Sequence, residues 1–171
     1  MLPHLDAAYS LARWIVRDNH LAEDVVQEAY LRAFRYFHRF HGEGARPWLL
    51  KIVRNTCYSW LQANRDMGNV LEFRNDENIC DVGDSSDSFG GNPESLLLSK
   101  ARREEVLVAV DALPLPFREV IVLREMEDMT YENIAEVMNI PLGTVMSRLS
   151  RARALLRKSL SQSQKGFRHE G

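Results

Sequence analysis

Residues 130–149 read TYENIAEVMNIPLGTVMSRL and are the most informative part of the chain. A helix-turn-helix needs a tight corner between two crossing helices, and the corner requires a residue that tolerates a left-handed backbone. Asn139 meets this requirement, and Thr130 is a favourable N-cap for the first of the two helices. Apolar residues on both sides of the corner are spaced to share one core: Ile134, Met138, Ile140, Val145 and Leu149. The stretch therefore predicts a helix-turn-helix.

The second helix of this motif is predicted over residues 141–160 and has two opposed faces. Val145, Leu149, Ala152 and Leu156 follow a helical period and belong inside. The remaining surface is basic, with no acidic residue between Glu136 and Glu170, and it carries Ser147, Arg148, Arg151, Arg153, Arg157 and Lys158. A helix of this kind suits phosphate neutralisation and the major groove of DNA. The alternative is a solvated basic helix at the end of a bundle, and the corner before it favours DNA binding.

Helical periodicity extends over both halves of the chain, and neither half shows a convincing strand pattern. A first helix is predicted over residues 5–15, and Asn19 can end it and cap the next helix. The second helix has an apolar stripe that recurs every four residues: Val25, Ala29, Ala33 and Phe37. Pro47 suits the first turn of a third helix, with five inward residues: Trp48, Ile52, Val53, Thr56 and Trp60. Further helices are predicted at 93–113 and from Pro116, which makes the chain all-α.

The two helical halves are separated by a segment of different composition. Residues 66–95 carry one basic and eight acidic residues, together with many turn formers. Such a stretch cannot bury enough surface to offset its ordering entropy, and structureless loops beyond about 12–15 residues are uncommon within one domain. We therefore expect two small helical domains, 1–65 and 94–171, joined by an acidic flexible linker, 66–93. The alternative is a surface loop within a single domain.

The net charge of −2 is the sum of segments with opposite charge. Residues 1–65 carry nine basic and six acidic residues, and residues 96–171 carry twelve and ten, so a near-neutral total does not exclude a DNA partner. No apolar run approaches the roughly 18–20 residues that span a membrane, and no secretory signal is visible. Cys57 and Cys80 form no Cys-x-x-Cys motif, which fits a reducing compartment. We expect a cytoplasmic protein with no membrane insertion.

The sequence offers little support for an enzyme. It contains no His-Glu-x-x-His, no Walker A loop and no Gly-x-Ser-x-Gly, so no catalytic residue and no cofactor are predicted. His38, His41 and Cys57 could share a metal ion. Short motifs have a high false-positive rate, and histidines at a helix end are more often solvated or packed, so no metal site is predicted.

Two further helical surfaces are candidates for binding. On the third helix Lys51, Asn55, Tyr58, Gln62 and Arg65 share one face, with Arg54 beside them. Cations, amides and an aromatic ring suit an unstacked DNA strand, although this helix alone is more simply explained as an ordinary polar face. The second helix has a mixed-charge face opposite its apolar stripe, formed by Asp24, Gln27, Glu28, Arg32 and Arg35. It is either a docking face for a protein or the site of a simple ion pair between Glu28 and Arg32.

The order of these segments resembles a known family. Residues 22–34, AEDVVQEAYLRAF, closely resemble the core-binding helix of bacterial RNA polymerase sigma factors of the extracytoplasmic-function class. Residues 48–56, WLLKIVRNT, are similar to the helix that this family uses on the −10 element, and residues 113–153 to its −35-reading domain. Two matches in the right order, split by a linker, are far more specific than a lone helix-turn-helix.

The resemblance implies a function and roles for matching residues. The chain would be an alternative sigma factor that binds RNA polymerase core and directs promoter-specific initiation. Core binding, at the clamp coiled coil, is implied for Asp24, Gln27, Glu28 and Arg32. The 38–46 loop would hold a flipped −10 base, and −10 DNA binding is implied for Arg46, Lys51, Arg54, Asn55 and Tyr58. The −35 duplex would be bound by Thr144, Ser147, Arg148, Arg151 and Arg153, while Met146 stands where many relatives have Lys or Arg.

Partners beyond DNA are also expected. The resemblance implies that the second domain would meet the polymerase flap. The flexible linker leads to the hypothesis that an anti-sigma factor regulates the protein by inserting between the two domains. The alternative function is a helix-turn-helix repressor or activator that acts without replacing a sigma factor. That alternative would explain the C-terminal half and leave the N-terminal match as coincidence.

Overall fold

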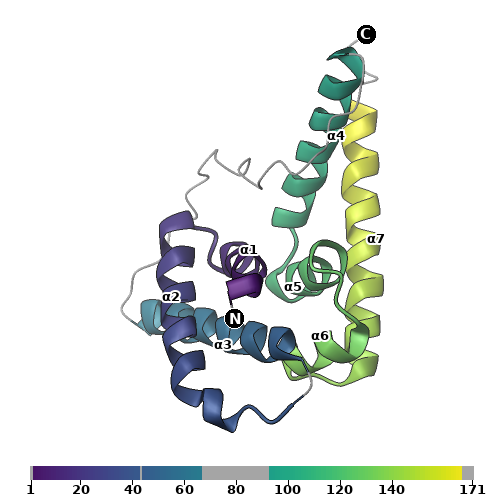
Figure 1. Ribbon diagram of the computed structural model, residues 1–171. Coiled ribbons are helices and arrows are strands. Elements are labelled where there is room, and N and C mark those ends of the chain that lie inside the picture. The colour runs from purple at the N-terminus through teal and green to yellow at the C-terminus, as the bar shows by residue number, and fades with distance from the viewer. Residues whose placement is uncertain (1, 43, 67–92, 167–171) are drawn as a thin grey trace.

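The structure is a computed structural model that describes residues 2–42, 44–66 and 93–166 (Figure 1). Within these residues all regular secondary structure is helical, which confirms the all-α prediction. The first group comprises α1 (Leu5–Val16), α2 (Asn19–Tyr36) and α3 (Ala45–Asp66), with the short 3₁₀ turns η1 (Leu2–His4) and η2 (Phe37–Arg39). The predicted linker lies almost entirely outside the described residues.

The second group begins with α4 (Pro93–Asp111), which lies alongside the long α7 (Leu142–Gly166) in Figure 1. Between them come α5 (Leu115–Ile121), a π-helical turn η3 (Val122–Met126) and α6 (Tyr131–Met138). None of the helices in the described part of the chain combines the length and the apolarity that a bilayer crossing requires.

The predicted helix-turn-helix is present as α6 and α7. The Thr130 hydroxyl accepts a hydrogen bond from the Asn133 amide at 3.2 Å, as an N-cap does. Asn139 ends α6 in the left-handed conformation, with φ 53°, and the next amide, that of Ile140, donates to the Ala135 carbonyl at 3.1 Å. The residues expected to form the shared core of the motif are buried or partly buried.

The corner between α1 and α2 differs from the prediction. Asn19 is the first residue of α2, and the cap is Asp18, whose carboxylate accepts from the Leu21 amide at 2.8 Å. The preceding residue, Arg17, closes α1 in the left-handed conformation with φ 60°. An aspartate is as good an N-cap as an asparagine, so the sequence offered two adjacent candidates and the prediction chose the wrong one.

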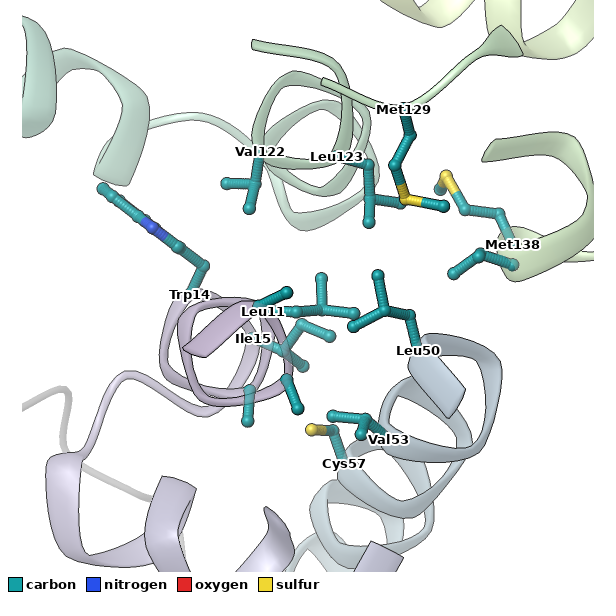
Figure 2. Close-up of a cluster of buried hydrophobic side chains, with 14 of the residues drawn as sticks. Leu11, Trp14, Ile15, Leu50, Val53, Cys57, Val122, Leu123, Met129 and Met138 are labelled. Atoms are coloured by element: carbon teal, nitrogen blue, oxygen red, sulfur yellow. The ribbon is translucent and has the colours of Figure 1, made fainter. Parts of the chain in front are cut away.

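The two groups of helices share one apolar core (Figure 2). Leu11 of α1 and Leu50 of α3 point toward the second group, and Val53 of α3 lies against α1 beside Cys57. The second group presents Val122 and Leu123 of η3, Met138 of α6, and Met129 from the loop between these two elements. Each group alone is small, and a small core stabilises a domain only marginally. The shared core therefore buries apolar surface that either group would expose by itself.

Candidate nucleic-acid interface

The outer face of α2 carries the residues that were predicted to bind core polymerase. Asp24, Gln27 and Glu28 are exposed, and Arg32 is partly exposed. Glu28 and Arg32 form an i, i+4 ion pair along the helix, as the simpler of the two interpretations expected. An exposed pair of this kind contributes only a few tenths of a kcal/mol to stability. The pair leaves Asp24 and Gln27 available on the same face.

The same face holds two large apolar residues that the sequence analysis missed. Leu31 is 63% exposed and Phe34 is 78% exposed. They follow Gln27 and Glu28 at helical spacing, on the side opposite the buried Ala29 and Ala33. Apolar side chains that lie among charges on an open helix face are typical of protein docking sites. Their spacing of three residues, out of phase with the apolar stripe, was a signal in the sequence.

Phe37 was predicted to belong to the inner stripe of α2, and this prediction is wrong. The side chain is 53% exposed, because the α-helix ends at Tyr36 and the chain turns into η2. Phe37 instead contacts Phe40 and Trp48, with ring centroids 6.3 and 6.5 Å apart, and Phe40 lies 5.1 Å from Trp48. The three rings form an aromatic cluster that includes Phe40 of the 38–46 loop. Aromatic rings of this kind can stack on unpaired bases.

His38, His41 and Cys57, the three residues considered for a metal site, do not lie in one place in the structure. His38 and His41 are exposed beyond the end of α2, whereas Cys57 is buried in the core. No group of three or more metal-ligating side chains occurs in the described residues. Burial raises the pKa of the Cys57 thiol to about 12, with a further contribution from the nearby Glu119 carboxylate. The thiol is therefore protonated and unreactive in the folded state.

The five residues predicted to bind −10 DNA all lie on α3 and fall into two sets. Asn55 is exposed and Lys51 is partly exposed, and among the described residues Lys51 forms no ion pair. Arg46, Arg54 and Tyr58 instead contact carboxylates of the second group. Sequence reasoning could not anticipate these contacts, because the partners are more than sixty residues away along the chain.

Glu119 of α5 is the centre of the larger of these contacts. Its carboxylate accepts from Arg54 Nε at 2.8 Å and from the Tyr58 hydroxyl at 2.8 Å. The Arg54 guanidinium also lies over the Tyr58 ring, 4.4 Å from its centroid. Burial raises the pKa of Glu119, while the Arg54 charge acts in the opposite direction. Burial and the Glu119 carboxylate together raise the pKa of the Tyr58 hydroxyl, which stays protonated and donates.

The second contact joins Arg46, at the start of α3, to the end of η3. Arg46 donates to the Glu127 carboxylate at 2.7 Å and to the Glu127 backbone carbonyl at 2.7 Å. The Glu127 side chain is largely buried, and the Arg46 side chain is partly exposed. Two hydrogen bonds from one guanidinium fix the orientation of the Arg46 side chain, whereas the ammonium group of a lysine would act only as a point charge.

The predicted −35 residues all lie on α7 but differ in their environments. Thr144 and Ser147 are in its first turns, and the Ser147 hydroxyl donates to the Thr144 carbonyl at 3.1 Å. Arg151 is exposed and, in the part of the chain that the structure describes, forms no ion pair. Arg153 donates to Glu125 at 2.7 Å, and Arg148 is partly buried, where its charge acts on Glu119. Arg151 is therefore the most accessible of the three arginines.

Met146 lies next to these residues on the exposed surface of the helix, at 49% exposure. An apolar side chain cannot neutralise a phosphate, but it can contact the methyl group of thymine in the major groove. The α7 surface thus combines small polar, cationic and apolar groups, which suits base contacts as well as phosphate contacts.

Comparisons with known proteins match each half of the chain to a family model. Residues 2–66 match the family Sigma-70 region 2, and residues 103–156 match Sigma-70, region 4. The chain is 38% identical over 133 residues to the ECF RNA polymerase sigma-E factor of Escherichia coli K12, which covers 76% of this chain and 69% of that protein. It is 36% identical over 152 residues to the sigma-E factor of Haemophilus influenzae, covering 88% and 79%.

Solved structures show the same fold. The sigma factor RpoE of Bartonella quintana, determined in complex with the anti-sigma factor NepR, matches with a TM-score of 0.68 and 26% identity, over 94% of this chain and 93% of that one. CnrH, determined in complex with the cytosolic domain of CnrY, matches with a TM-score of 0.63 and 23% identity, over 94% and 84%.

Proposed function

The chain belongs to the extracytoplasmic-function class of RNA polymerase sigma factors, and on this basis we propose which of its surfaces bind polymerase and promoter DNA. As a member of this family it is an alternative sigma factor that directs transcription initiation. A repressor would not account for the match over residues 2–66. The proposal assigns no catalytic residue to the chain, and its site of action is the cytoplasm, where core polymerase works.

Core polymerase binds the outer face of α2. Asp24, Gln27, Glu28 and Arg32 contact the coiled coil of the clamp, as in the family, and the exposed Leu31 and Phe34 supply the apolar centre of the interface. The observation that supports this assignment is the exposure of both apolar side chains among charged neighbours. In protein–protein interfaces a few buried side chains contribute most of the binding free energy, and charged residues lie at the rim. The second group of helices contacts the polymerase flap.

Promoter DNA binds two surfaces. The −10 strand binds Arg46, Lys51, Arg54, Asn55 and Tyr58 on α3, and a flipped base lies in the 38–46 loop next to the aromatic cluster of Phe37, Phe40 and Trp48. Melting DNA costs about 1–2 kcal/mol per base-pair step, and capture of unstacked bases offsets part of that cost. The −35 duplex binds Thr144, Ser147, Arg148, Arg151 and Arg153 on α7.

An anti-sigma factor is the second protein partner. The sigma factor RpoE of Bartonella quintana was determined in complex with an anti-sigma factor, which supports a partner of the same class here. We place its binding site between the two groups of helices, on surfaces that become accessible when the groups separate.

The core-binding assignment is tested with Asp24→Arg in a binding assay with purified core polymerase. We expect a loss of affinity of at least tenfold, because a charge reversal within an interface is costly, whereas binding to an isolated −35 duplex stays unchanged. Asp6→Arg is the matched control, since Asp6 is an exposed acid on α1 and is not one of the α2 residues assigned to the clamp. Equal affinities of the two variants for core polymerase would show that the α2 face is not the docking site.

A further inference from the structure

An open hollow lies on the flank of α7, where this helix packs against α6. Its volume of about 350 Å³ is roughly ten times the volume that one water molecule takes up in the liquid, so a phosphate group fits inside it. The residues that line the hollow come from both helices of the helix-turn-helix: Tyr131 of α6 and Met146, Leu149, Ser150, Arg153 and Arg157 of α7. The lining therefore extends along α7 beyond the five residues assigned to the −35 element.

Met146, Ser150, Arg153 and Arg157 form one straight face of α7. They follow one another at spacings of 4, 3 and 4 residues, and the eleven residues from Met146 to Arg157 make close to three full turns of helix. At a rise of 1.5 Å per residue, Arg157 lies about 16 Å further along the helix than Met146, on the same side. Figure 1 shows that α7 continues in this direction well past α6.

The positive charge of this face is uncompensated at Arg157. Arg153, the other cation in the lining, donates to the Glu125 carboxylate at 2.7 Å. Arg157 is exposed and, within the described ranges, takes part in no ion pair. The sequence of α7 contains no acidic residue that could pair with it along the helix. An anion that enters the hollow therefore meets an available guanidinium.

The geometry of a helix-turn-helix on DNA brings a phosphate backbone to this hollow. In this motif the first turns of the second helix contact base edges in the major groove, and the first helix crosses the backbone. The major groove is about 12 Å wide, so a side chain about 16 Å beyond Met146 on a straight helix lies at the edge of the groove. That edge consists of phosphates, and the hollow opens between the helix that crosses the backbone and the helix that reads the bases.

We propose that the α6–α7 hollow is a phosphate-binding site, in which Arg157 contacts one backbone phosphate of the promoter duplex at the edge of the −35 element. This inference rests on the assignment of α7 as the −35 surface, and it adds a contact that the five assigned residues do not include. The contact reads no base. It adds affinity and fixes how α7 enters the groove, because phosphate contacts set the register and orientation of a protein on a duplex.

The test measures how salt affects the binding of holoenzyme to a short duplex. The full chain is assembled with purified core polymerase, and fluorescence anisotropy gives its dissociation constant for a labelled duplex that contains the −35 element of a promoter that the protein uses, with its flanks. Each neutralised phosphate contributes about 0.9 to the slope of log K against log salt concentration. Arg157→Ala should therefore reduce the slope by about one and weaken binding equally for all flanking sequences. Alanine is a strong helix former, so α7 stays folded.

Two variants are the controls for this measurement. Arg157→Lys keeps the charge and should keep most of the slope, because a lysine also binds phosphate, as a point charge. Arg102→Ala removes an exposed arginine from α4, which contributes no residue to the lining of the hollow, and the slope should stay at the wild-type value.

Uncharged methylphosphonates, placed at one position of the duplex at a time, locate the phosphate. At one position at the edge of the −35 element, the replacement should weaken binding of the wild-type holoenzyme and have no further effect on Arg157→Ala. The two changes are expected to be non-additive because both remove the same contact.

The remaining outcomes overturn the proposal. An unchanged slope in Arg157→Ala would show that Arg157 contacts no phosphate, and an equal fall in Arg102→Ala would show a diffuse effect of net charge. A lower slope with additive effects at every methylphosphonate position would show that no single phosphate occupies the hollow. If the wild-type holoenzyme has no preference for the −35 element, the assignment of α7 fails as well, whereas normal −35 binding with an unaffected Arg157→Ala refutes this inference alone.

Discussion

Leu123→Ala tests whether the two helical groups form one cooperative structure. Leu123 lies in η3 of the second group, is fully buried, and points into the shared core in Figure 2. All three tryptophans, Trp14, Trp48 and Trp60, belong to α1 and α3 of the first group. Tryptophan fluorescence therefore follows the first group, while far-ultraviolet circular dichroism follows the helices of both.

The expected loss can be estimated from the burial of this side chain. Leu→Ala at a fully buried site costs about 3 kcal/mol of unfolding free energy. With a urea m-value of about 2 kcal/mol per M, the midpoint falls by about 1.5 M. Because the core is shared, the fluorescence midpoint of the first group should fall by the same amount as the dichroism midpoint, although the substitution is in the second group.

Leu98→Ala is the matched control. Leu98 is on α4 of the second group at 59% exposure, so the same chemical change should cost less than about 0.5 kcal/mol. The reasoning would be refuted if Leu123→Ala lowered the dichroism midpoint while the fluorescence midpoint stayed at the wild-type value. That result would mean that the two groups unfold independently.

Two further predictions concern Cys57 and Arg151. In a Cys80→Ser background, Cys57 should react with iodoacetamide at pH 8 far more slowly in the native protein than in the urea-unfolded protein. The reason is that a pKa of about 12 leaves a thiolate fraction of only about 10⁻⁴. Equal reaction rates in the two states would contradict the burial of Cys57. The native state holds this proton more tightly than the unfolded chain, so the free energy of unfolding should fall by about 2 kcal/mol between pH 8 and pH 10.5. The Cys57→Ala variant should show a smaller fall. A melting temperature that rises over this pH range would contradict the predicted direction. Arg151→Ala should weaken binding to a −35 duplex and reduce the salt slope by about one, with core binding intact, and an unchanged slope would remove Arg151 from the phosphate contacts.

Local chemistry explains which parts of the structure were predictable. Thr130 caps a helix and Asn139 takes a left-handed turn because of their own side chains, so the helix-turn-helix could be predicted within a window of twenty residues. The buried face of α7 could be predicted in the same way, because its apolar residues recur at helical spacing. The corner at Asp18 and Asn19 was uncertain because both side chains can cap.

The docking of the two groups had no local signal. Glu119 and Arg118 are charged residues on a short helix, and charged residues are rarely buried without partners. Their partners, Arg54 and the Trp14 carbonyl, are 65 and 104 residues away, which no periodicity can reveal. The exposed Leu31 and Phe34 were detectable in principle, because apolar residues out of phase with a helix stripe indicate a second face. Their role required knowing that nothing in the described chain covers them.

The most direct test of the central claim is transcription in vitro with purified core polymerase on a library of promoter fragments. We predict start sites that require this protein, share a −10 and a −35 sequence, and disappear with Asp24→Arg. If no start site depends on the protein and no complex with core polymerase forms, the chain does not act as a sigma factor.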